Sequence, residues 1–295
     1  MKYFELMQSA VDCFREHDIP EPEADAMVLL EYVYQVKASD YFLKKMEMLP
    51  EDEVLFQTFQ DCVKQRCTHK PVQYITGSWS FMGLNLNVNE HVLIPRFDTE
   101  ILVEEALKRG KWELQKACDN HAWKLLDMCT GSGCIAISLA HFWKELTGAG
   151  EDCQVMAVDL SAEALEVAKG NSRLHHLDIR FVQSDLFTEL EESERFDMIV
   201  SNPPYIESGE IPKLMPEVCD FEPMMALDGS EDGLKFYRAI TKTAPRYLND
   251  GGWLLFEIGC EQGKAVQKLM REAGFENIEI IKDLAGLDRV VAGKI

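Results

Sequence analysis

The sequence predicts an α/β protein with a mostly parallel sheet that is covered by helices on both faces. Short apolar runs alternate with amphipathic segments from about residue 123 onward, which is the pattern of strand–helix–strand units. The links between these segments are short. The chain has 295 residues, of which 46% are hydrophobic. This is enough to bury a large core without a disulfide or a metal ion.

The first 72 residues are predicted to form a small helical domain. Apolar side chains recur every three or four residues near the N-terminus, and two prolines near residue 21 separate this helix from the next. Ser39 or Asp40 is expected to cap a short third helix, and residues 54–67 to form a fourth. We expect the domain at 1–72 to recognise a substrate and to carry no chemistry itself.

A β-hairpin is predicted to link this helical domain to the sheet. Leu84, Leu86 and Val88 alternate with asparagines, which is typical of a half-buried strand. Glycines before and within this region are expected to form bends. The predicted boundaries are therefore 73–95 for the hairpin linker and 96–295 for the second domain.

The second domain is predicted to begin with a helix and to continue as alternating strands and helices. Asp98 or Thr99 is expected to cap the first helix, which extends through residue 107. The strand candidates are 124–128, 154–159, 179–183, 197–201, 252–258, 278–282 and 289–293. The helices between them are expected at 133–143, 162–172, 234–247 and 262–273.

Charge and cysteine content narrow the class of protein. The chain has 30 basic and 51 acidic residues and a formal charge of −21, which disfavours nucleic acid as the main partner. The nine cysteines include no Cys-x-x-Cys pair, so free thiols in a reducing cytoplasm and no metal site are expected. No signal peptide and no membrane span are predicted. The expected location is cytoplasmic.

A glycine-rich motif lies where the first strand of the sheet turns into a helix. It runs from Asp127 to Ala136 as Asp-Met-Cys-Thr-Gly-Ser-Gly-Cys-Ile-Ala. Two glycines permit a tight turn, and the helix that follows offers free backbone N–H groups to a ligand. The motif alone is a weak indication of nucleotide binding, because an ordinary turn fits it as well.

Two aspartates follow the next two strands. Asp159 ends the second strand, where a carboxylate can accept hydrogen bonds from both ribose hydroxyls of an adenosine-containing cofactor. Asp185 follows the third strand and can accept from an adenine amino group. Each alone could be a turn residue. Because ligands of open α/β sheets bind beyond the carboxyl ends of the strands, the glycine loop and both aspartates predict a cofactor site.

The most specific motif is Asn202-Pro203-Pro204-Tyr205, which follows the fourth strand. The prolines fix the backbone and exclude a helix. The side-chain oxygen of Asn202 and the carbonyl of Pro203 then become rigid neighbouring acceptors, with an aromatic ring beside them. A proline-stiffened turn is the plainer alternative, but it does not explain why the motif falls at the same edge of the sheet.

These motifs together resemble those of S-adenosylmethionine-dependent methyltransferases that act on amino or amide nitrogen. Further segments are similar to the release-factor glutamine N5-methyltransferase (PrmC/HemK) family. They are Pro-Val-Gln-Tyr-Ile-Thr-Gly at 71–77, Leu-Ile-Pro-Arg-Phe-Asp-Thr-Glu at 93–100, Phe-Glu-Pro-Met-Met-Ala-Leu-Asp-Gly at 221–229, Glu-Ile-Gly at 257–259 with Gln262, and Asp-Leu-Ala-Gly at 283–286 with Arg289. The sequence departs from the family pattern at Phe97, Cys129 and Leu186, and its loop at 144–153 is longer than usual.

The resemblance implies a Rossmann-like, seven-stranded methyltransferase sheet whose last strand is antiparallel. It implies methyl transfer from S-adenosyl-L-methionine to the glutamine of the Gly-Gly-Gln motif in peptide chain release factors. The catalytic residues it implies are Asn202, Pro203 and Tyr205, and Pro204 joins them in binding the substrate. The cofactor-binding residues it implies are Cys129, Thr130, Gly131, Ser132, Gly133, Asp159, Asp185, Leu186 and Asn202.

Three other functions remain open from the sequence. Asn-Pro-Pro-Tyr also occurs in enzymes that methylate an exocyclic amine of DNA or RNA, although the acidic charge disfavours them. A nicotinamide dehydrogenase could use the glycine loop and Asp159, but it has no use for the motif at 202–205. A non-catalytic scaffold that binds a cofactor or a partner is also compatible with the sequence.

Overall fold

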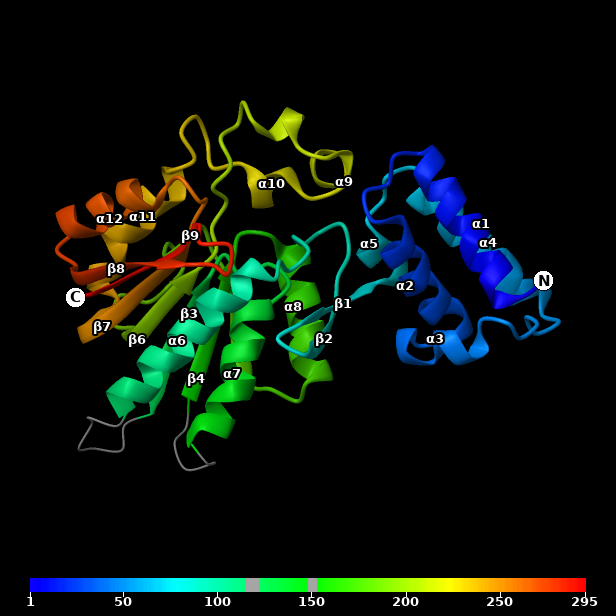
Figure 1. The fold of residues 1–295 in the computed structure, drawn as a ribbon. Coiled ribbons are helices and arrows are strands. Elements are labelled where there is room, and N and C mark those ends of the chain that lie inside the picture. Colours follow the sequence, from blue (N-terminus) through cyan, green and yellow to red (C-terminus); the bar gives the residue numbers. More distant parts are fainter. Residues whose placement is uncertain (115–121, 148–152) are drawn as a thin grey trace. The chain divides into compact units, whose positions relative to one another are not determined.

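The computed structural model describes residues 1–114, 122–147 and 153–295, and it divides the chain into two compact units (Figure 1). One unit contains residues 1–78 and 215–221, and the other contains residues 79–214 and 222–295. Part of the long loop at 144–153, residues 148–152, lies outside the described residues. No helix of the described residues is long and apolar enough to cross a bilayer.

The first unit is helical, as predicted. Its helices are α1 (Tyr3–Glu16), α2 (Pro22–Tyr34), α3 (Ala38–Lys44), α4 (Glu53–Arg66), α5 (Val72–Thr76) and α9 (Pro216–Cys219). Leu6, Phe14 and Phe59 are fully buried in its core. The predicted caps of α3 are wrong, because the helix begins at Ala38 after Lys37 and so already includes Ser39 and Asp40.

One buried arginine joins separate segments of the helical unit. Arg66, at the end of α4, donates to Asp25 of α2 at 2.6 Å and also pairs with Glu217 of α9. Its side chain is only 4% exposed. A buried charge is costly unless it is paired, so both carboxylates are needed to hold Arg66 in place.

The hairpin is present at the start of the second unit. Strands β1 (Ser78–Phe81) and β2 (Leu84–Asn87) form a two-stranded sheet. Met82 and Gly83, between them, have φ angles of +50° and +75°, as a two-residue turn of type I′ requires. The side chain of Asn171 donates to the Asn87 carbonyl at 2.9 Å and accepts from the Asn87 amide at 2.7 Å, which fixes the hairpin to the sheet domain.

The main sheet has seven strands, in the order β5-β4-β3-β6-β7-β9-β8. They are β3 (Trp123–Met128), β4 (Cys153–Asp159), β5 (Ile179–Gln183), β6 (Phe196–Ser201), β7 (Leu248–Glu257), β8 (Glu276–Lys282) and β9 (Asp288–Lys294). β9 pairs antiparallel with both of its neighbours, whereas the pairs among β3 to β7 are parallel. The expected antiparallel last strand is therefore confirmed. β4 and β6 lie on opposite sides of β3, so the strand order reverses direction at β3. In open α/β sheets a ligand site is expected beyond the carboxyl ends of the strands at such a point.

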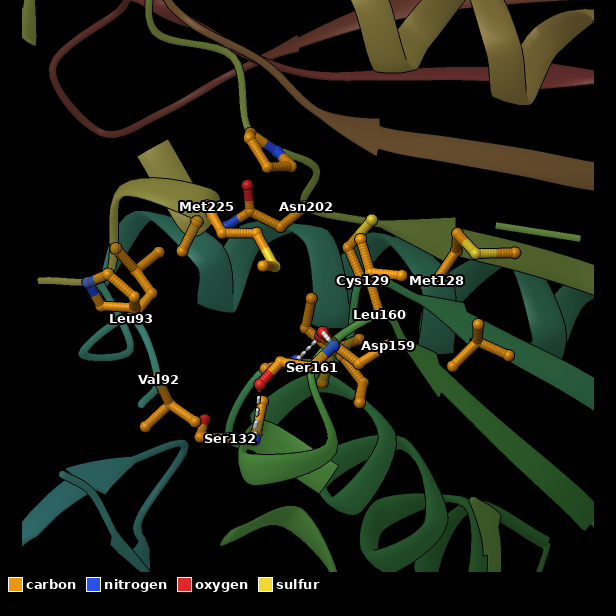
Figure 2. A pocket seen from close by; sticks show the side chains of 18 of the residues that line it. Val92, Leu93, Met128, Cys129, Ser132, Asp159, Leu160, Ser161, Asn202 and Met225 are labelled. Atoms are coloured by element: carbon orange, nitrogen blue, oxygen red, sulfur yellow. Dashed lines mark hydrogen bonds between the residues drawn. The ribbon is translucent and has the colours of Figure 1, made fainter. Parts of the chain in front are cut away.

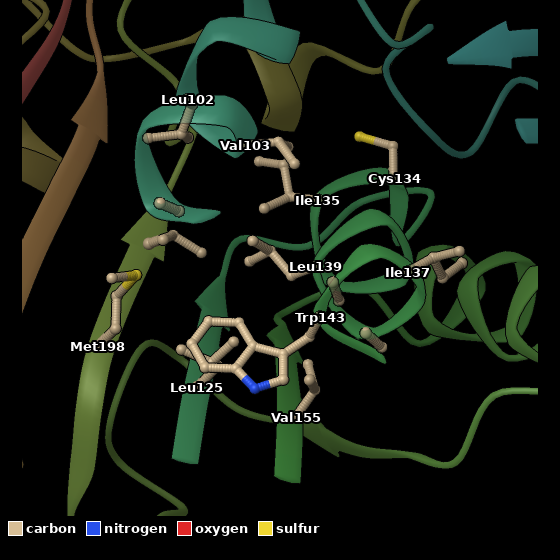
Figure 3. Close-up of a cluster of buried hydrophobic side chains, with 14 of the residues drawn as sticks. Leu102, Val103, Leu125, Cys134, Ile135, Ile137, Leu139, Trp143, Val155 and Met198 are labelled. Atoms are coloured by element: carbon tan, nitrogen blue, oxygen red, sulfur yellow. The ribbon is translucent and has the colours of Figure 1, made fainter. Parts of the chain in front are cut away.

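Helices cover both faces of this sheet, as predicted (Figure 1). One face carries α6 (Asp98–Leu114), α7 (Cys134–Thr147) and α8 (Ala162–Leu174), and the other carries α11 (Lys235–Thr243) and α12 (Gly263–Glu272). Figure 3 shows the core under α6 and α7, in which Leu139 and Trp143 lie over Leu125 of β3. Short helical segments at η1 (Ile211–Lys213) and α10 (Met224–Leu227) were not predicted.

Several predicted boundaries are wrong, among them the end of α7, which continues to Thr147 and does not end at residue 143. α6 continues to Leu114 and begins at Asp98, so Thr99 lies inside its first turn and is not a cap. The helix expected at 234–247 ends at Thr243 and continues as a 3₁₀ turn, η2 (Ala244–Arg246), because Pro245 has no N–H to donate. β7 begins four residues early, at Leu248, which pairs with Phe196 beyond an irregularity in the register.

The contact between α6 and α7 requires a glycine at position 110. A Cβ atom on Gly110 would lie 2.3 Å from the Trp143 ring, whereas one on Gly170 in α8 would meet nothing within 4 Å. Alanine favours a helix over glycine by about 1 kcal/mol, but overpacking a core costs about 1–3 kcal/mol. We expect Gly110→Ala to lower the free energy of unfolding and Gly170→Ala to raise it. Urea denaturation measures both, and stabilisation by Gly110→Ala would contradict the packing.

Candidate active site

A cavity of about 210 Å³ lies at the carboxyl ends of β3, β4, β5 and β6 (Figure 2). Most of the site residues predicted from the sequence line it: Cys129, Thr130, Gly131, Ser132, Asp159, Asp185, Leu186, Asn202 and Pro204. Gly133, Pro203 and Tyr205 are not among its lining residues. Figure 2 shows Asn202 and Met225 on one side of the cavity and Asp159, Ser161 and Ser132 on the other.

The glycine loop is held from behind by a buried carboxylate. Asp127, at the end of β3, accepts from the Thr130 hydroxyl at 2.6 Å and from the Ala136 amide at 3.1 Å. Burial raises the pKa of Asp127 to about 7, although these two hydrogen bonds act in the opposite direction. Asp127 therefore ties the loop to the start of α7 and does not line the cavity.

The two glycines of the loop, Gly131 and Gly133, have different structural roles. Gly131 has a φ of +54°, and a Cβ there would meet nothing within 4 Å. Its backbone is therefore open to close approach by a ligand. Gly133 has a φ of +81°, and a Cβ there would lie 3.1 Å from side chains of Ala168 and Ile137. It permits packing of α7 on α8, which explains why it does not line the cavity.

Two residues that depart from the family pattern adopt backbone conformations that favour glycine. Cys129 and Leu186 have φ angles of +66° and +51°, and the left-handed region costs a residue with a side chain about 1–2 kcal/mol. Both line the cavity. A glycine would adopt the backbone conformation of Cys129 without this cost.

Asp159, at the end of the neighbouring strand β4, holds the glycine loop through hydrogen bonds. One of its carboxylate oxygens accepts from the Gly131 amide at 2.8 Å, and the other accepts from the Ser161 amide at 2.9 Å. Burial raises the pKa of Asp159 above its ordinary range. Each carboxylate oxygen has a second acceptor site, so Asp159 can still receive hydrogen bonds from a ligand. Asp185 is exposed at the rim.

The side chain of Asn202 is oriented by a residue that the sequence did not single out. Its Nδ2 donates to the hydroxyl oxygen of Thr99 at 3.3 Å, and Thr99 is buried in the first turn of α6. Because the nitrogen is engaged, the side-chain oxygen remains available as an acceptor. The predicted acceptor role of Asn202 is therefore compatible with its hydrogen bond to Thr99.

Behind Asn202 lies a buried carboxyl group, Glu257, at the end of β7. It accepts from the Tyr205 hydroxyl at 3.4 Å, and the Thr99 hydroxyl is near enough to lower its pKa. Glu257 is 1% exposed. Burial, together with the nearby carboxylate, raises the pKa of Tyr205 above its ordinary value, so the phenol stays protonated. Thr99 thus orients Asn202, and Glu257 binds the hydroxyl of Tyr205.

The backbone of Tyr205 is fixed by two glycines and a glutamine. A Cβ on Gly229 would lie 2.7 Å from the Tyr205 Cα, and one on Gly233 would lie 2.3 Å from its carbonyl oxygen. The same carbonyl accepts from Gln262 Nε2 at 2.9 Å. Gly229 and Gln262 lie in two of the segments that resemble the family, but the sequence predicts no role for them. In the structure they hold the backbone of the motif at 202–205 in position.

Part of the cavity lining was not predicted from the sequence. Residues 90–93, 95 and 96, together with Met225 and Phe236, also line it. Arg96 donates to Glu222 at 2.6 Å, and Glu222 also accepts from the Ile94 amide at 3.3 Å. The segment at 93–100 stood out only by its resemblance to a family, since nothing in its periodicity indicates a binding site.

The raised pKa of Glu257 predicts a pH-dependent stability. Burial raises this pKa to about 7, against the opposing effects of Thr99 and Arg289, while an unperturbed glutamate titrates at 4.5. Between pH 4.5 and pH 7 the folded protein keeps a proton on Glu257 that the unfolded chain has released. The ionisation of Glu257 therefore makes the free energy of unfolding fall as the pH rises through this range.

Replacing this group by Glu257→Gln removes its titration. Relative to the unmodified protein, we expect the variant to gain stability between pH 4.5 and pH 8, by up to about 3 kcal/mol. Urea denaturation at several pH values measures the difference. A difference that is independent of pH would show that Glu257 titrates normally.

Comparison with known proteins adds to this geometry. Residues 5–77 match the PrmC N-terminal domain, and residues 105–217 match the methyltransferase small domain. The release factor glutamine methyltransferase of Clostridium acetobutylicum is 39% identical over 294 residues, which cover 99% of this chain and 98% of that protein. The chain belongs to the release factor glutamine methyltransferase family.

Other members of the release factor glutamine methyltransferase family agree with this assignment. The protein of that name from Geobacter sulfurreducens is 44% identical over 233 residues, which cover 79% of this chain and 76% of the relative. Among solved structures, the hMettl16 catalytic domain in complex with the MAT2A 3′UTR hairpin 6 has a TM-score of 0.53 at 15% identity, with 83% of each chain covered. That likeness shows the fold alone.

Proposed function

We propose that this protein transfers the methyl group of S-adenosyl-L-methionine to the side-chain amide nitrogen (N5) of the glutamine in the Gly-Gly-Gln motif of peptide chain release factors. The observation that carries the proposal is the position of Asn202. It lies on the wall of the cavity that the glycine loop and Asp159 also line, and Thr99 orients it. The printed names of the relatives supply the substrate class. This substrate implies a cytoplasmic enzyme.

The lining of the cavity fits the proposed cofactor. The open space beside Gly131 lets a ligand approach the loop backbone, and α7 begins directly after the loop. Asp159 would accept hydrogen bonds from the ribose, and the exposed Asp185 from the adenine amino group. Leu186 lines the same region and supplies apolar contact. When bound, S-adenosylmethionine supplies an electrophilic methyl group on a sulfonium.

The substrate amide needs help from the protein, because its nitrogen lone pair is delocalised into the carbonyl. We assign its two N–H groups to the Asn202 side-chain oxygen and the Pro203 carbonyl. These acceptors favour a pyramidal nitrogen with its lone pair directed toward the methyl group. Pro204, on the cavity wall, and the ring of Tyr205 would bound the plane of the amide. Positioning and electrostatics then supply most of the rate enhancement.

The methyl transfer balances without a covalent intermediate on the enzyme. A bond forms between the amide nitrogen and the methyl carbon as the methyl–sulfur bond breaks, and the sulfur keeps the electron pair as a neutral thioether. The nitrogen then releases one proton to water. Neither Asn202 nor Tyr205 has to accept this proton, which agrees with the raised pKa of Tyr205.

We assign recognition of the release factor to the helical domain at 1–72. Two observations support this role. Residues 5–77 match the PrmC N-terminal domain. On α3, Phe42 and Leu43 are 75% and 83% exposed, and large exposed apolar side chains are more frequent at protein-binding surfaces than elsewhere on a protein.

The experiment that tests the function compares three substrates. The protein is incubated with methyl-labelled S-adenosylmethionine and, separately, a release factor, duplex DNA or ribosomal RNA. We expect label only in the release factor, and none in a matched release factor with Gly-Gly-Ala in place of Gly-Gly-Gln. Label in a nucleic acid alone would assign the enzyme to base methylation, and cofactor binding without any transfer would favour a scaffold.

A further inference from the structure

Three side chains that commonly bind metal ions meet in the helical unit. Cys13 and His17 lie at the end of α1, and Cys67 directly follows the last residue of α4. The two sulfur atoms are 3.1 Å apart. Both sulfurs and one ring nitrogen of His17 lie within 4.8 Å of one another. None of the residues assigned above to methyl transfer belongs to this group.

The helix geometry and a backbone hydrogen bond prepare His17 to act as a ligand. Residues four apart share one face of a helix, which places His17 beside Cys13. Nδ1 of His17 lies 2.8 Å from the Cys13 carbonyl oxygen, so it donates its proton there. Nε2 then keeps its lone pair for a metal ion. Histidine ligands usually donate their second nitrogen to an acceptor in this way.

We propose that Cys13, His17 and Cys67 bind one Zn²⁺ ion. Two thiolates and one imidazole form a donor set that zinc prefers. In a tetrahedral site with Zn–S bonds of about 2.3 Å the sulfur atoms lie about 3.8 Å apart. The two sulfurs therefore have to separate by less than about 1 Å from their present positions. Each thiol loses its proton when the ion binds.

The fourth position of this zinc site is open to water. Among the residues that the structure describes, the ligand group has three members, and His17 is exposed. Cys13 and Cys67, by contrast, are half-buried against the core of the helical unit. The ion thus binds at the edge of the core and joins the ends of α1 and α4 through two cysteines that are 54 positions apart in the sequence. Binding should stabilise the helical unit.

Zinc content measured on the full-length protein tests the proposal. The protein is reduced, dialysed against Zn²⁺ and analysed for bound metal. We expect Cys13→Ser and Cys67→Ser to bind about one equivalent less than the unmodified protein, as a three-ligand site requires. Cys260→Ser removes an exposed cysteine outside the cluster, and this control should keep the full zinc content.

Three further measurements distinguish a specific zinc site from nonspecific metal binding. Co²⁺ in place of Zn²⁺ should give a thiolate-to-cobalt charge-transfer absorption that both cysteine variants lose and Cys260→Ser keeps. His17 is exposed, so His17→Ala should fold normally and weaken Zn²⁺ binding by about tenfold or more. Zn²⁺ should raise the unfolding temperature of the unmodified protein by several degrees, and that of the cysteine variants by much less.

Two results would overturn the zinc site. One is equal zinc content in the unmodified protein and in both cysteine variants. The other is a Cys13–Cys67 disulfide in protein purified without reductant, together with no zinc uptake after reduction. That result would mean that the 3.1 Å sulfur contact is a thiol pair that dissolved oxygen oxidises to a disulfide, with both thiol protons and two electrons passing to the oxygen. Neither result bears on methyl transfer, which is measured separately.

Discussion

Asn202→Ala is expected to lower the rate of methyl transfer to the release-factor glutamine by about a hundredfold or more. The variant removes one of the two acceptors assigned to the substrate amide, and loss of a preorganised polar contact to a transition state has an effect of this size. The fold should persist, because Asn202 is only half-buried and its side chain binds Thr99 through a single 3.3 Å hydrogen bond among the residues that the structure describes. Cofactor affinity should change little, since the glycine loop and Asp159 remain.

Single-turnover methylation at saturating cofactor, read by mass spectrometry of the glutamine peptide, measures this effect. Asn202→Asp keeps the acceptor and the shape, so it should retain more activity than the alanine variant. Thr99→Val removes the hydroxyl that orients Asn202 at nearly constant volume, and we expect an intermediate loss, whereas Thr99→Ser should be nearly normal. Near-normal rates for Asn202→Ala would refute the mechanism, even if the substrate is correct.

The sheet and the cofactor side of the cavity could be predicted because they are local in sequence. Each of the strands β3 to β6 is a short run rich in apolar residues, such as that from Trp123 to Met128, and each is followed within a few residues by a polar ligand candidate. Parallel strands bring their carboxyl ends to one edge. Asp159, Asp185 and Asn202 therefore had to lie near the glycine loop, and they line one cavity with it.

The support of Asn202 could not be predicted, because it depends on residues far apart in the chain. Thr99 and Asn202 are separated by 103 positions, and Tyr205 and Glu257 by 52. No periodicity connects them, and the sequence predicts only that Asp98 or Thr99 caps a helix. The cluster of Cys13, His17 and Cys67 was missed for the same reason, since it is assembled from the ends of two helices. Such contacts depend on the packing of the finished fold.

Asp159→Ala is expected to weaken the binding of S-adenosylmethionine by about 10- to 150-fold. A hydrogen bond to a charged acceptor contributes about 1.5–3 kcal/mol, and 1.4 kcal/mol corresponds to a tenfold change in affinity. Asp159 also holds the Gly131 amide at 2.8 Å, so part of the loss could come from a loosened loop. Asp185→Ala is the matched control, because Asp185 is exposed and is proposed to make a single contact to the adenine. We expect it to lose only a few-fold in affinity.

A pair of ligands separates the two contributions of Asp159. Titration calorimetry compares S-adenosylhomocysteine with its 2′,3′-dideoxy analogue, which lacks both ribose hydroxyls. If Asp159 binds those hydroxyls, the unmodified protein should prefer the complete ligand by at least about tenfold, and Asp159→Ala should hardly distinguish the two, because residues in contact show non-additive effects. A loosened loop would weaken both ligands equally in the variant and preserve the preference. Preserved discrimination in Asp159→Ala would therefore exclude the ribose assignment while leaving Asp159 as a support of the glycine loop.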